Sequence, residues 1–426
     1  MSDLLYARWL MGLSLAFHIV FAAVGVAMPL FMVIAEWRWR RTGEPIHLEL
    51  ARRWAKGTAI LFAVGAVSGT VLSFELGLLW PRFMEFSGAL IGMPFSLEGF
   101  AFFTEAIFLG IYLYGWERVG PRLHLVSGVL VAASGAASAF FVTLANAWMN
   151  VPAIGVPPSR AMFPEGWAVE VVHVLLSSYL ATGFVVAGIH AFLLLRDPQS
   201  RFHRLALGVT LAVGGAAAIL QPISGDFSAR RVAKVQPLKL AALEGQFETL
   251  RGAPLRIGGL PDVDKEQTRL AIEIPRGLSL LAFHDPSAEV KGLRAFPRAD
   301  WPNVTAVHLS FQIMVACGTL LAIVSIAGLV LARRFRTASF PHWYLVAVAI
   351  CGPLGFVALE AGWLVTELGR QPYVVYGVLR TSEAVTPVQK LAAPFWAFTA
   401  LYLFLSWTVA VLLKRQIFGA RKEERQ

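Results

Sequence analysis

A short set of titratable side chains stands inside long apolar segments of this 426-residue sequence. The set comprises His18, Glu75, Glu98, Glu105, His173, His190, His308, Glu360 and Glu367, with Met314 as a further donor in such a segment. Such groups are costly at membrane depth unless they are paired or take part in chemistry, so each is a functional candidate. Imidazoles, a thioether and carboxylates form a donor set that suits haem iron.

Two kinds of haem site are open to these donors. A His and a Met from separate helices would give a six-coordinate electron-transfer haem, whereas a His or Glu facing an open position would give a haem that binds oxygen. A packing role is the alternative, since a lone membrane His often hydrogen-bonds between helices and a lone Met usually fills space. Spacing alone leaves both interpretations open for His18 and for His173 with Met314. Glu75 and His190 lack an equally placed partner and are interpreted as structural or lining groups.

Two pairs of carboxylates show a common spacing. Glu98 and Glu105 are seven residues apart, as are Glu360 and Glu367. Seven residues are about two helical turns, so each pair projects from nearly one face of a helix. Stacked carboxylates inside a membrane suit a proton relay. Pairing with a buried cation is the alternative, but no Lys or Arg lies within the predicted spans.

Composition places the chain in a lipid bilayer. Hydrophobic residues make up 57% of it, charged residues 15%, and the mean hydropathy is +0.62. Soluble proteins carry roughly 25% charged residues. The net charge of +10 does not indicate nucleic acid as a partner, because the basic residues flank apolar segments, as in membrane proteins. Cys317 and Cys351 both lie in apolar runs, which excludes a disulfide framework and a thiolate metal site.

The hydropathy pattern predicts an all-α polytopic membrane protein of about nine transmembrane helices, taking about 20 apolar residues per crossing. The predicted spans are residues 9–35, 57–79, 95–116, 126–147, 168–195, 205–223, 304–331, 343–366 and 391–413. The first is too long, and lacks the cleavage-site character, for a removed signal peptide. The chain thus divides into helices 1–6 (residues 1–223), a polar insert (224–303), and helices 7–9 with a basic tail (304–426).

The distribution of basic residues predicts the orientation. Arg and Lys cluster after the first, third, fifth and seventh spans, for example at Arg333, Arg334 and Arg336, and in the C-terminal tail. The positive-inside rule makes those sides and the C-terminus cytoplasmic, so the N-terminus and the insert face outward. Helical rise then places five candidate ligands in the outer half of the membrane: His18, His173, Met314, Glu98 and Glu367. A polar connection as long as the insert is usually functional or partly disordered.

Several motifs carry a resemblance. The most specific begins at Glu360 and reads EAGWLVTELGRQP. A second, QPLKLAALE, begins at Gln236 in the insert, and LEG at residues 97–99 is followed by FFTE, which ends at Glu105. Together with the NAWM run at Asn146, the HVLLSSY run at His173, and His18, these motifs resemble subunit I of cytochrome bd-type quinol oxidases. The resemblance covers essentially the whole chain.

The resemblance implies three haem groups. His173 and Met314 would be the axial ligands of a low-spin haem b. His18 and Glu367 would be ligands of two high-spin haems, one a haem b and the other a haem d or a further haem b. Glu98 would lie beside the oxygen-reducing haem as a further candidate ligand. The motif residues expected to border the haems are Trp363, Gln312 and Arg370.

The resemblance also implies sites for quinol and for protons. Lys239, Glu244 and Gln236 would contact quinol, while Glu105 and Asn146 would belong to the proton route. A carboxylate such as Glu244 can accept a quinol proton while Lys239 orients an oxygen. Quinol oxidation at the periplasmic face would release protons outward, and reduction of O2 to water would take up cytoplasmic protons. The membrane would thereby be charged without a separate pump.

The implied assembly is a complex in the bacterial inner membrane. Its other members would be a second membrane subunit without haem and a very small third subunit. The electron donor would be ubiquinol or menaquinol.

Three residues depart from the family pattern. Gln312 stands where Arg is common, which removes a positive charge and predicts a lower haem potential. Tyr373 replaces Trp, and Asn150 replaces Gln. The insert is also short for the family. These departures indicate a divergent branch of the cyanide-insensitive kind, in which haem b can take the place of haem d.

Two other functions could use some of the same residues. A proton-coupled transporter would use the membrane carboxylates for its substrate, and predicts inverted repeats or Gly/Pro-broken helices in matching halves, which the sequence does not show. A haem b quinone redox protein without O2 reduction would keep His173 and Met314 but would not need His18 and Glu367. The presence of all four favours the oxidase.

Overall fold

The computed structural model describes residues 3–335 and 340–418. Within these ranges, 9 helices are long and apolar enough to cross a membrane, which confirms the predicted helical membrane architecture. Short strands, chiefly in the polar insert, are additions that the sequence did not predict. Arg336 and residues 419–426 of the predicted basic tail lie outside the described residues.

Contacts divide the chain into two compact units. Unit 1 comprises Met1–Val142, Arg196–Thr210 and Ala384–Gln426, and unit 2 comprises Thr143–Leu195 and Leu211–Glu383. Neither unit is a continuous stretch of sequence, because helices distant in the sequence pack together while α4, α6 and α7 each run from one unit into the other.

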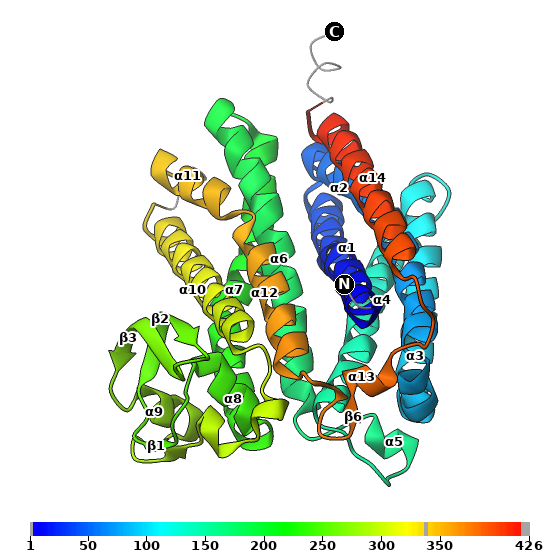
Figure 1. The fold of residues 1–426 in the computed structure, drawn as a ribbon. Coiled ribbons are helices and arrows are strands. Elements are labelled where there is room, and N and C mark those ends of the chain that lie inside the picture. The colour runs from blue at the N-terminus through cyan, green and yellow to red at the C-terminus, as the bar shows by residue number, and fades with distance from the viewer. Residues whose placement is uncertain (1–2, 336–339, 419–426) are drawn as a thin grey trace. The chain divides into compact units, whose positions relative to one another are not determined.

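Unit 1 is built around long helices that begin with proline. Pro45, Pro81 and Pro121 each occupy the first helical position, where proline costs no hydrogen bond and its fixed φ suits the helix. Helix α3 therefore starts well before the predicted Phe95, and Glu98 lies in its middle. The main helices of this unit are α1 (Asp3–Thr42), α2 (Pro45–Leu79), α3 (Pro81–Tyr114), the first part of α4 (Pro121–Asn150) and α14 (Ala392–Phe418) (Figure 1).

Small residues let α1 and α4 approach closely. A Cβ added at Gly135 of α4 would lie 3.0 Å from the carbonyl oxygen of Gly25 in α1 and 3.5 Å from the carboxyl of Glu105 in α3. Small residues at such contacts are the usual means of close packing between membrane helices. The Glu105 carboxyl is thereby held at the junction of α1, α3 and α4.

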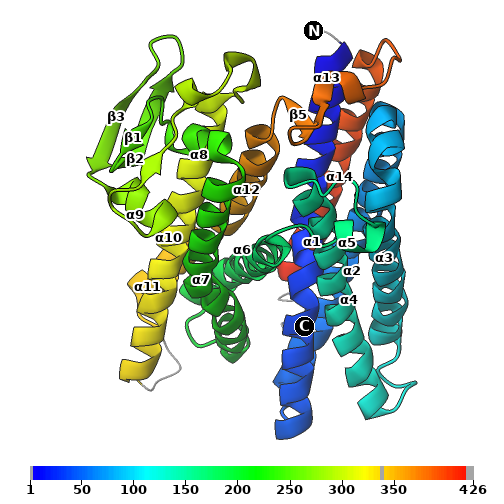
Figure 2. The ribbon, with the colours of Figure 1, turned by 90° about the horizontal axis from the view of Figure 1, so that it is seen from below.

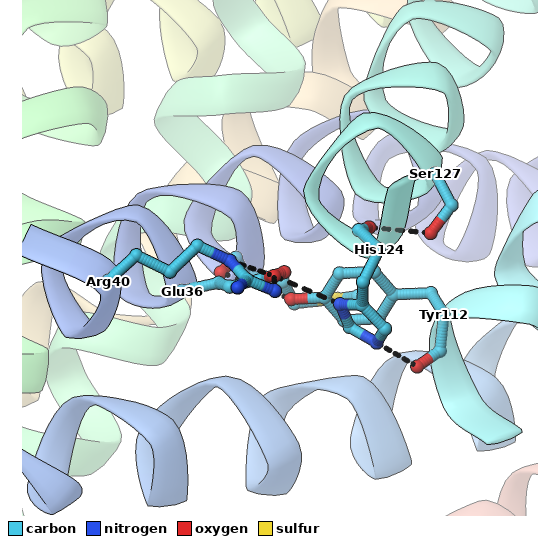
Figure 3. A network of polar contacts seen from close by, with 6 residues as sticks. Glu36, Arg40, Tyr112, His124 and Ser127 are labelled. Carbon is cyan, nitrogen blue, oxygen red and sulfur yellow. Dashed lines mark hydrogen bonds and ion pairs between the residues drawn. The ribbon is translucent and has the colours of Figure 1, made fainter. Parts of the chain in front are cut away.

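A buried polar network joins the same three helices further along (Figure 3). His124 of α4 hydrogen-bonds through Nδ1 to Glu36 Oε1 at 2.9 Å and through Nε2 to the carbonyl of Tyr112 at 3.0 Å. Arg40 Nη2 lies 2.5 Å from Glu36 Oε1, and Ser127 Oγ donates to the carbonyl of His124. The Glu36 side chain is fully buried, so these bonds replace water at Oε1, while Oε2 has no partner among the described residues.

Unit 2 contains a helix pair and an interrupted helix. Gly183 of α6 and Gly214 of α7 meet closely, since a Cβ at Gly214 would lie 2.8 Å from the Cα of Gly183. The eighth predicted span is two helices, separated at Gly352 and Pro353, and Gly352 contacts Gly188 of α6. The helices of this unit are α6 (Trp167–Arg196), α7 (Arg201–Val235), α10 (Val304–Phe335), α11 (His342–Cys351) and α12 (Leu354–Gly369).

Helix α7 extends beyond the predicted end at Ile223. Its polar continuation is stabilised by ion pairs with residues at the start of α6 and just before it: Arg231 pairs with Glu170, and Lys234 Nζ lies 2.7 Å from Glu165 Oε1. Apolar composition marks only the membrane-compatible part of a helix, so hydropathy missed this extension.

The insert after α7 is an ordered subdomain, packed at one end of α7 and α10 (Figure 2). Strands β2 and β3 form an antiparallel hairpin that pairs Leu255 with Ile274. An apolar cluster with Leu243, Phe247 and Leu293 at its centre attaches the subdomain to Val307 of α10. The elements are α8 (Pro237–Glu244), β1 (Leu250–Arg251), β2 (Leu255–Asp262), β3 (Gln267–Ile274), α9 (Gly277–Phe283), β4 (Glu289–Val290) and two 3-10 turns, Leu293–Ala295 and Arg298–Asp300.

Short elements complete unit 2 and the return to unit 1. They are α5 (Pro158–Ala161), the β5–β6 hairpin (Tyr373–Val375 and Leu379–Arg380) and α13 (Thr381–Ala384).

The buried network predicts a large loss of stability on Glu36→Ala. The substitution leaves Arg40 and His124 without their carboxylate, and breaking a buried charge pair costs about 3–5 kcal/mol. Glu49→Ala is the matched control, because Glu49 forms a similar i,i+4 pair with Arg53 at the surface, worth about 0–1 kcal/mol. Unfolding of the purified protein in detergent measures both. Equal losses for the two variants would contradict the assigned role.

Candidate functional site

The predicted site residues fall into both units. His18, Glu98 and Glu105 belong to unit 1. Unit 2 contains the others, which are Asn146, His173, Gln236, Lys239, Glu244, Gln312, Met314, Trp363, Glu367 and Arg370.

The carboxylate of Glu367, near the end of α12, accepts hydrogen bonds on both oxygens. Asn146 Nδ2 donates to Oε1 at 2.8 Å, and Arg370 Nη2 donates to Oε2 at 2.5 Å. Asn150 Nδ2 in turn donates to Asn146 Oδ1 at 2.9 Å. The amide network therefore fixes the orientation of the Glu367 side chain, and the unused lone pairs of its oxygens can still bind a metal.

Arg370 carries donors that the chain does not use. Its side chain is 1% exposed, and its Nε and Nη1 have no acceptor among the residues that the structure describes. Buried donors without partners are unfavourable, and those of a guanidinium especially so. An anionic group bound beside Arg370 would satisfy them, as the propionates of a haem would.

Helix α8 of the insert packs against the end of α12. The Lys239 side chain lies on Gly369, where an added Cβ would be 2.8 Å from its Cε, and its Nζ lies 3.4 Å from the carbonyl of Thr366. Gln236 Nε2 donates to the carbonyl of Asn150 at 2.9 Å. Burial lowers the pKa of Lys239 to about 8, while the nearby carboxylates of Glu170 and Glu367 act in the opposite direction.

Glu244 ends helix α8 and is also buried, with 3% exposure. Burial raises its pKa to about 7, and the charge of Arg256 offsets part of this shift. Its Oε2 has no hydrogen-bond partner within residues 3–335 and 340–418. A carboxyl in this state can accept or donate a proton near neutral pH.

Gln312 and His308, one turn apart on α10, hold the insert to that helix. Gln312 Oε1 accepts from the backbone N–H of Gly258 at 2.9 Å, and its Nε2 donates to the carbonyl of Arg256 at 3.1 Å. Both ring nitrogens of His308 reach carbonyls, Leu243 at 2.7 Å and Gly258 at 3.1 Å. The Gln312 side-chain amide thus accepts from one backbone group of strand β2 and donates to another, as the backbone of a paired strand does. The sequence did not predict this role.

His173 and Met314 lie on α6 and α10, each beside a glycine of another helix. A Cβ added at Gly362 of α12, next to the half-buried Trp363, would lie only 3.1 Å from Met314 Sδ. The His173 ring lies against Ser224 and Gly225 of α7. The Gly362 position explains the glycine in the EAGW motif, because a larger residue would displace the sulfur.

The unit 1 candidates lie on α1 and α3. His18 Nδ1 lies 3.0 Å from Ser68 Oγ of α2. Glu105 is buried and its Oε1 has no partner in the described part of the chain, whereas Glu98 is only half-buried. Both are on α3, at the expected spacing.

Glu75 has partners that the sequence did not indicate. Ser14 Oγ donates to Glu75 Oε1 at 2.8 Å, and the Tyr402 hydroxyl donates to Ser14 Oγ at 2.8 Å. The hydrogen-bond partners of serine hydroxyls, and those of His308, cannot be predicted from a single sequence. They depend on which helix or strand packs beside each residue.

The donor set fits haem better than a metal centre built by side chains alone. No group of three or more His, Cys, Asp or Glu suited to a metal ion occurs in the described residues. Haem iron needs only one or two protein ligands, and His173, Met314, His18 and Glu367 are of the right types. The unsatisfied donors of Arg370 and the glycine beside Met314 support the same interpretation.

Comparison with known proteins agrees with these observations. Residues 6–420 match the family described as cytochrome bd terminal oxidase subunit I. A putative cytochrome bd menaquinol oxidase subunit I of Bacillus subtilis is 38% identical, covering 97% of this chain and 96% of its own. Cytochrome bd-II ubiquinol oxidase subunit 1 of Escherichia coli is 28% identical, covering 97% of this chain and 96% of its own.

A solved structure shares the fold. The bd oxidase of Geobacillus thermodenitrificans superposes with a TM-score of 0.91 and 37% sequence identity, covering 97% of this chain and 98% of that one. The match confirms the expected family and the multi-span membrane architecture. The chain belongs to the cytochrome bd terminal oxidase subunit I family.

Proposed function

We propose that this chain is the haem-bearing subunit of a quinol oxidase, which oxidises quinol at the outer membrane face and reduces O2 to water. The observation that carries the proposal is the docking of α8, with buried Lys239 and Glu244, onto the end of α12 that bears Glu367 and Arg370. Unit 2 thereby contains both an acid–base pair suited to quinol and a ligand set suited to haem.

Lys239, Glu244 and Gln236 would bind and deprotonate quinol. The unpartnered Glu244 Oε2 would accept a proton from a quinol hydroxyl, because its pKa of about 7 permits proton uptake and release at neutral pH. Lys239 would orient the second oxygen. Gln236, bonded to Asn150, would hold the start of α8 in place.

Four side chains would hold iron. His173 and Met314 would ligate a low-spin haem b, while His18 and Glu367 would ligate two high-spin haems, either haem b with haem d or haem b at both sites. When bound, these groups would supply electron transfer and O2 reduction. Arg370 would neutralise an anionic haem substituent, and Trp363 would lie at the haem border. Gln312 would act indirectly, by holding β2 to the Met314 helix.

Glu98, Glu105 and Asn146 would serve the reduction of oxygen. Glu105, buried at the α1–α3–α4 junction with an unpartnered oxygen, would carry protons taken from the cytoplasm. Glu98 would lie beside the oxygen-reducing haem, and Asn146 would orient Glu367. Release of protons at the outer face and uptake of protons from the cytoplasm would generate a proton motive force without pumping. In this orientation the N-terminus and the insert would be outside and the C-terminus in the cytoplasm.

The proposed complex contains further chains in the bacterial inner membrane. The matched relatives are named as subunit I or subunit 1 of menaquinol or ubiquinol oxidases. A second membrane subunit and a very small third subunit would accompany this chain, with either quinol as donor.

Oxygen uptake by the purified complex tests the proposed function. Addition of a short-chain ubiquinol or menaquinol should start O2 consumption, and Glu244→Gln should slow it strongly. A haem-containing complex that consumes no O2 with either quinol would favour a quinone redox protein instead.

The pH dependence of kcat/KM for quinol tests the acid–base pair. Below pH about 7 Glu244 is protonated and cannot accept a proton, and above pH about 8 Lys239 loses its charge. The profile should therefore be bell-shaped, falling towards tenfold per pH unit on each side. Glu244→Gln should remove the acid limb, while the exposed Glu248→Gln should preserve both limbs. An acid limb that persists in Glu244→Gln would exclude Glu244 as the base.

Met314→Leu keeps the bulk of the side chain but deletes the sulfur. The low-spin haem should lose its six-coordinate reduced spectrum, because leucine cannot ligate iron. Met28→Leu, at a buried site in α1, should leave the spectrum unchanged. A wild-type spectrum for Met314→Leu would remove Met314 from the ligand set.

A further inference from the structure

The two histidines proposed as haem ligands share one local arrangement, although they belong to different units. His18 Nδ1 lies 3.0 Å from the hydroxyl of Ser68, and His173 Nδ1 lies 2.9 Å from the hydroxyl of Ser224. In both cases the serine belongs to a neighbouring helix, α2 for His18 and α7 for His173.

Each of these serine hydroxyls has a backbone carbonyl of its own helix as an acceptor for its proton. Ser68 Oγ donates to the carbonyls of Val64 and Gly65, at 3.0 and 3.1 Å, on its own helix. Ser224 Oγ donates in the same way to the carbonyl of Gln221, at 2.9 Å. A hydroxyl has one proton, so towards the imidazole each serine oxygen can only accept. The proton of each neutral ring must then be on Nδ1, which leaves the lone pair on Nε2.

A second contact of His173 leads to the same tautomer. The side-chain amide of Gln221 points its Nε2 at His173 Nε2, at 3.2 Å. An amide nitrogen only donates hydrogen bonds, so His173 Nε2 must be an acceptor. Both contacts therefore assign the Nδ1–H tautomer to His173, and iron bound at Nε2 would replace the Gln221 amide as the partner of that lone pair.

A glycine follows each serine and faces the same edge of the ring. A Cβ added at Gly69 would lie 3.0 Å from Cε1 of His18, and one at Gly225 would lie 3.7 Å from Cε1 of His173. At Gly69 the contact is tighter than side chains normally tolerate, so any larger residue would shift the ring. At Gly225 the added Cβ would make only an ordinary contact, so a glycine limits the ring position at His18 alone, while a serine contacts Nδ1 at both histidines.

We propose that Ser68 with Gly69, and Ser224, are positioning residues that hold His18 and His173 in the Nδ1–H tautomer and present Nε2 to haem iron. The inference rests on the proposed function, in which both histidines are iron ligands. Histidines that bind metals usually donate their other ring N–H to an acceptor, which fixes the tautomer and makes the imidazole a stronger electron donor.

The midpoint potential of the low-spin haem tests the role of Ser224 at His173. Ser224→Ala removes the acceptor, so the imidazole donates less electron density, the ferric state is less stabilised, and the potential should rise. Ser228→Ala is the control, since Ser228 lies one turn further on α7 and donates only to a backbone carbonyl. It should leave the potential at the wild-type value.

Two variants of equal bulk separate the hydroxyl from the space that it fills. Ser224→Thr retains an acceptor and should keep the wild-type potential, whereas Ser224→Val should show the positive shift. Equal potentials for Thr and Val, or equal shifts for Ser224→Ala and Ser228→Ala, would overturn the inference.

The pair at His18 is tested by haem retention and by the carbon monoxide difference spectrum of the purified complex. Ser68→Ala and Gly69→Ala should each reduce high-spin haem content or alter that spectrum. Ser73→Ala, exposed on the same helix, should do neither. Wild-type haem content and spectrum in both Ser68→Ala and Gly69→Ala would contradict the role of this pair.

The variant His173→Ala separates a failure of the haem-ligand assignment from a failure of the role given to Ser224. If wild-type complex binds haem and His173→Ala abolishes the low-spin signal, the ligand assignment stands whatever Ser224→Ala does. If His173→Ala leaves the signal intact, the ligand assignment fails and the role of Ser224 fails with it.

Discussion

The absence of water in a membrane interior is the constraint on which this structure depends. A polar group at that depth must find its partner within the protein, or in a bound group. Glu36 illustrates the first case, since its Oε1 is bonded by Arg40 of the same helix and by His124 of α4 (Figure 3). Arg370 and Glu105 illustrate the second, because buried polar atoms of both lack partners in the described residues.

Helix α12 links the parts of the candidate site in unit 2. Gly362 makes room for the sulfur of Met314, and Glu367 is oriented by Asn146 and Arg370. Gly369 then receives the side chain of Lys239 from the insert. Both glycines, Glu367 and Arg370 belong to the EAGWLVTELGR motif, which combines close packing at its glycines with polar contacts at its end. The two hydrogen bonds of the Gln312 amide hold the insert to α10.

Sequence alone predicted the parts of this molecule that depend on composition or on long motifs. Apolar runs predicted the nine spans, and the motif around Glu367 predicted the family. Hydropathy could not show that α7 continues past Ile223, because ion pairs rather than apolar residues stabilise that continuation. Nor could it show the contacts of Ser68, Ser224 or the Gln312 amide, since each depends on which helix or strand lies beside it.

The binding of haem by this chain in a quinol oxidase is tested most directly by a difference spectrum. The spectrum is that of the dithionite-reduced minus the air-oxidised purified complex. Pyridine haemochrome analysis of the same sample identifies the macrocycles. We expect haem b bands in the difference spectrum. They should either be accompanied by a far-red chlorin band from haem d, or occur alone and shift when carbon monoxide is added. A complex that is folded and assembled but shows no haem bands would contradict this expectation.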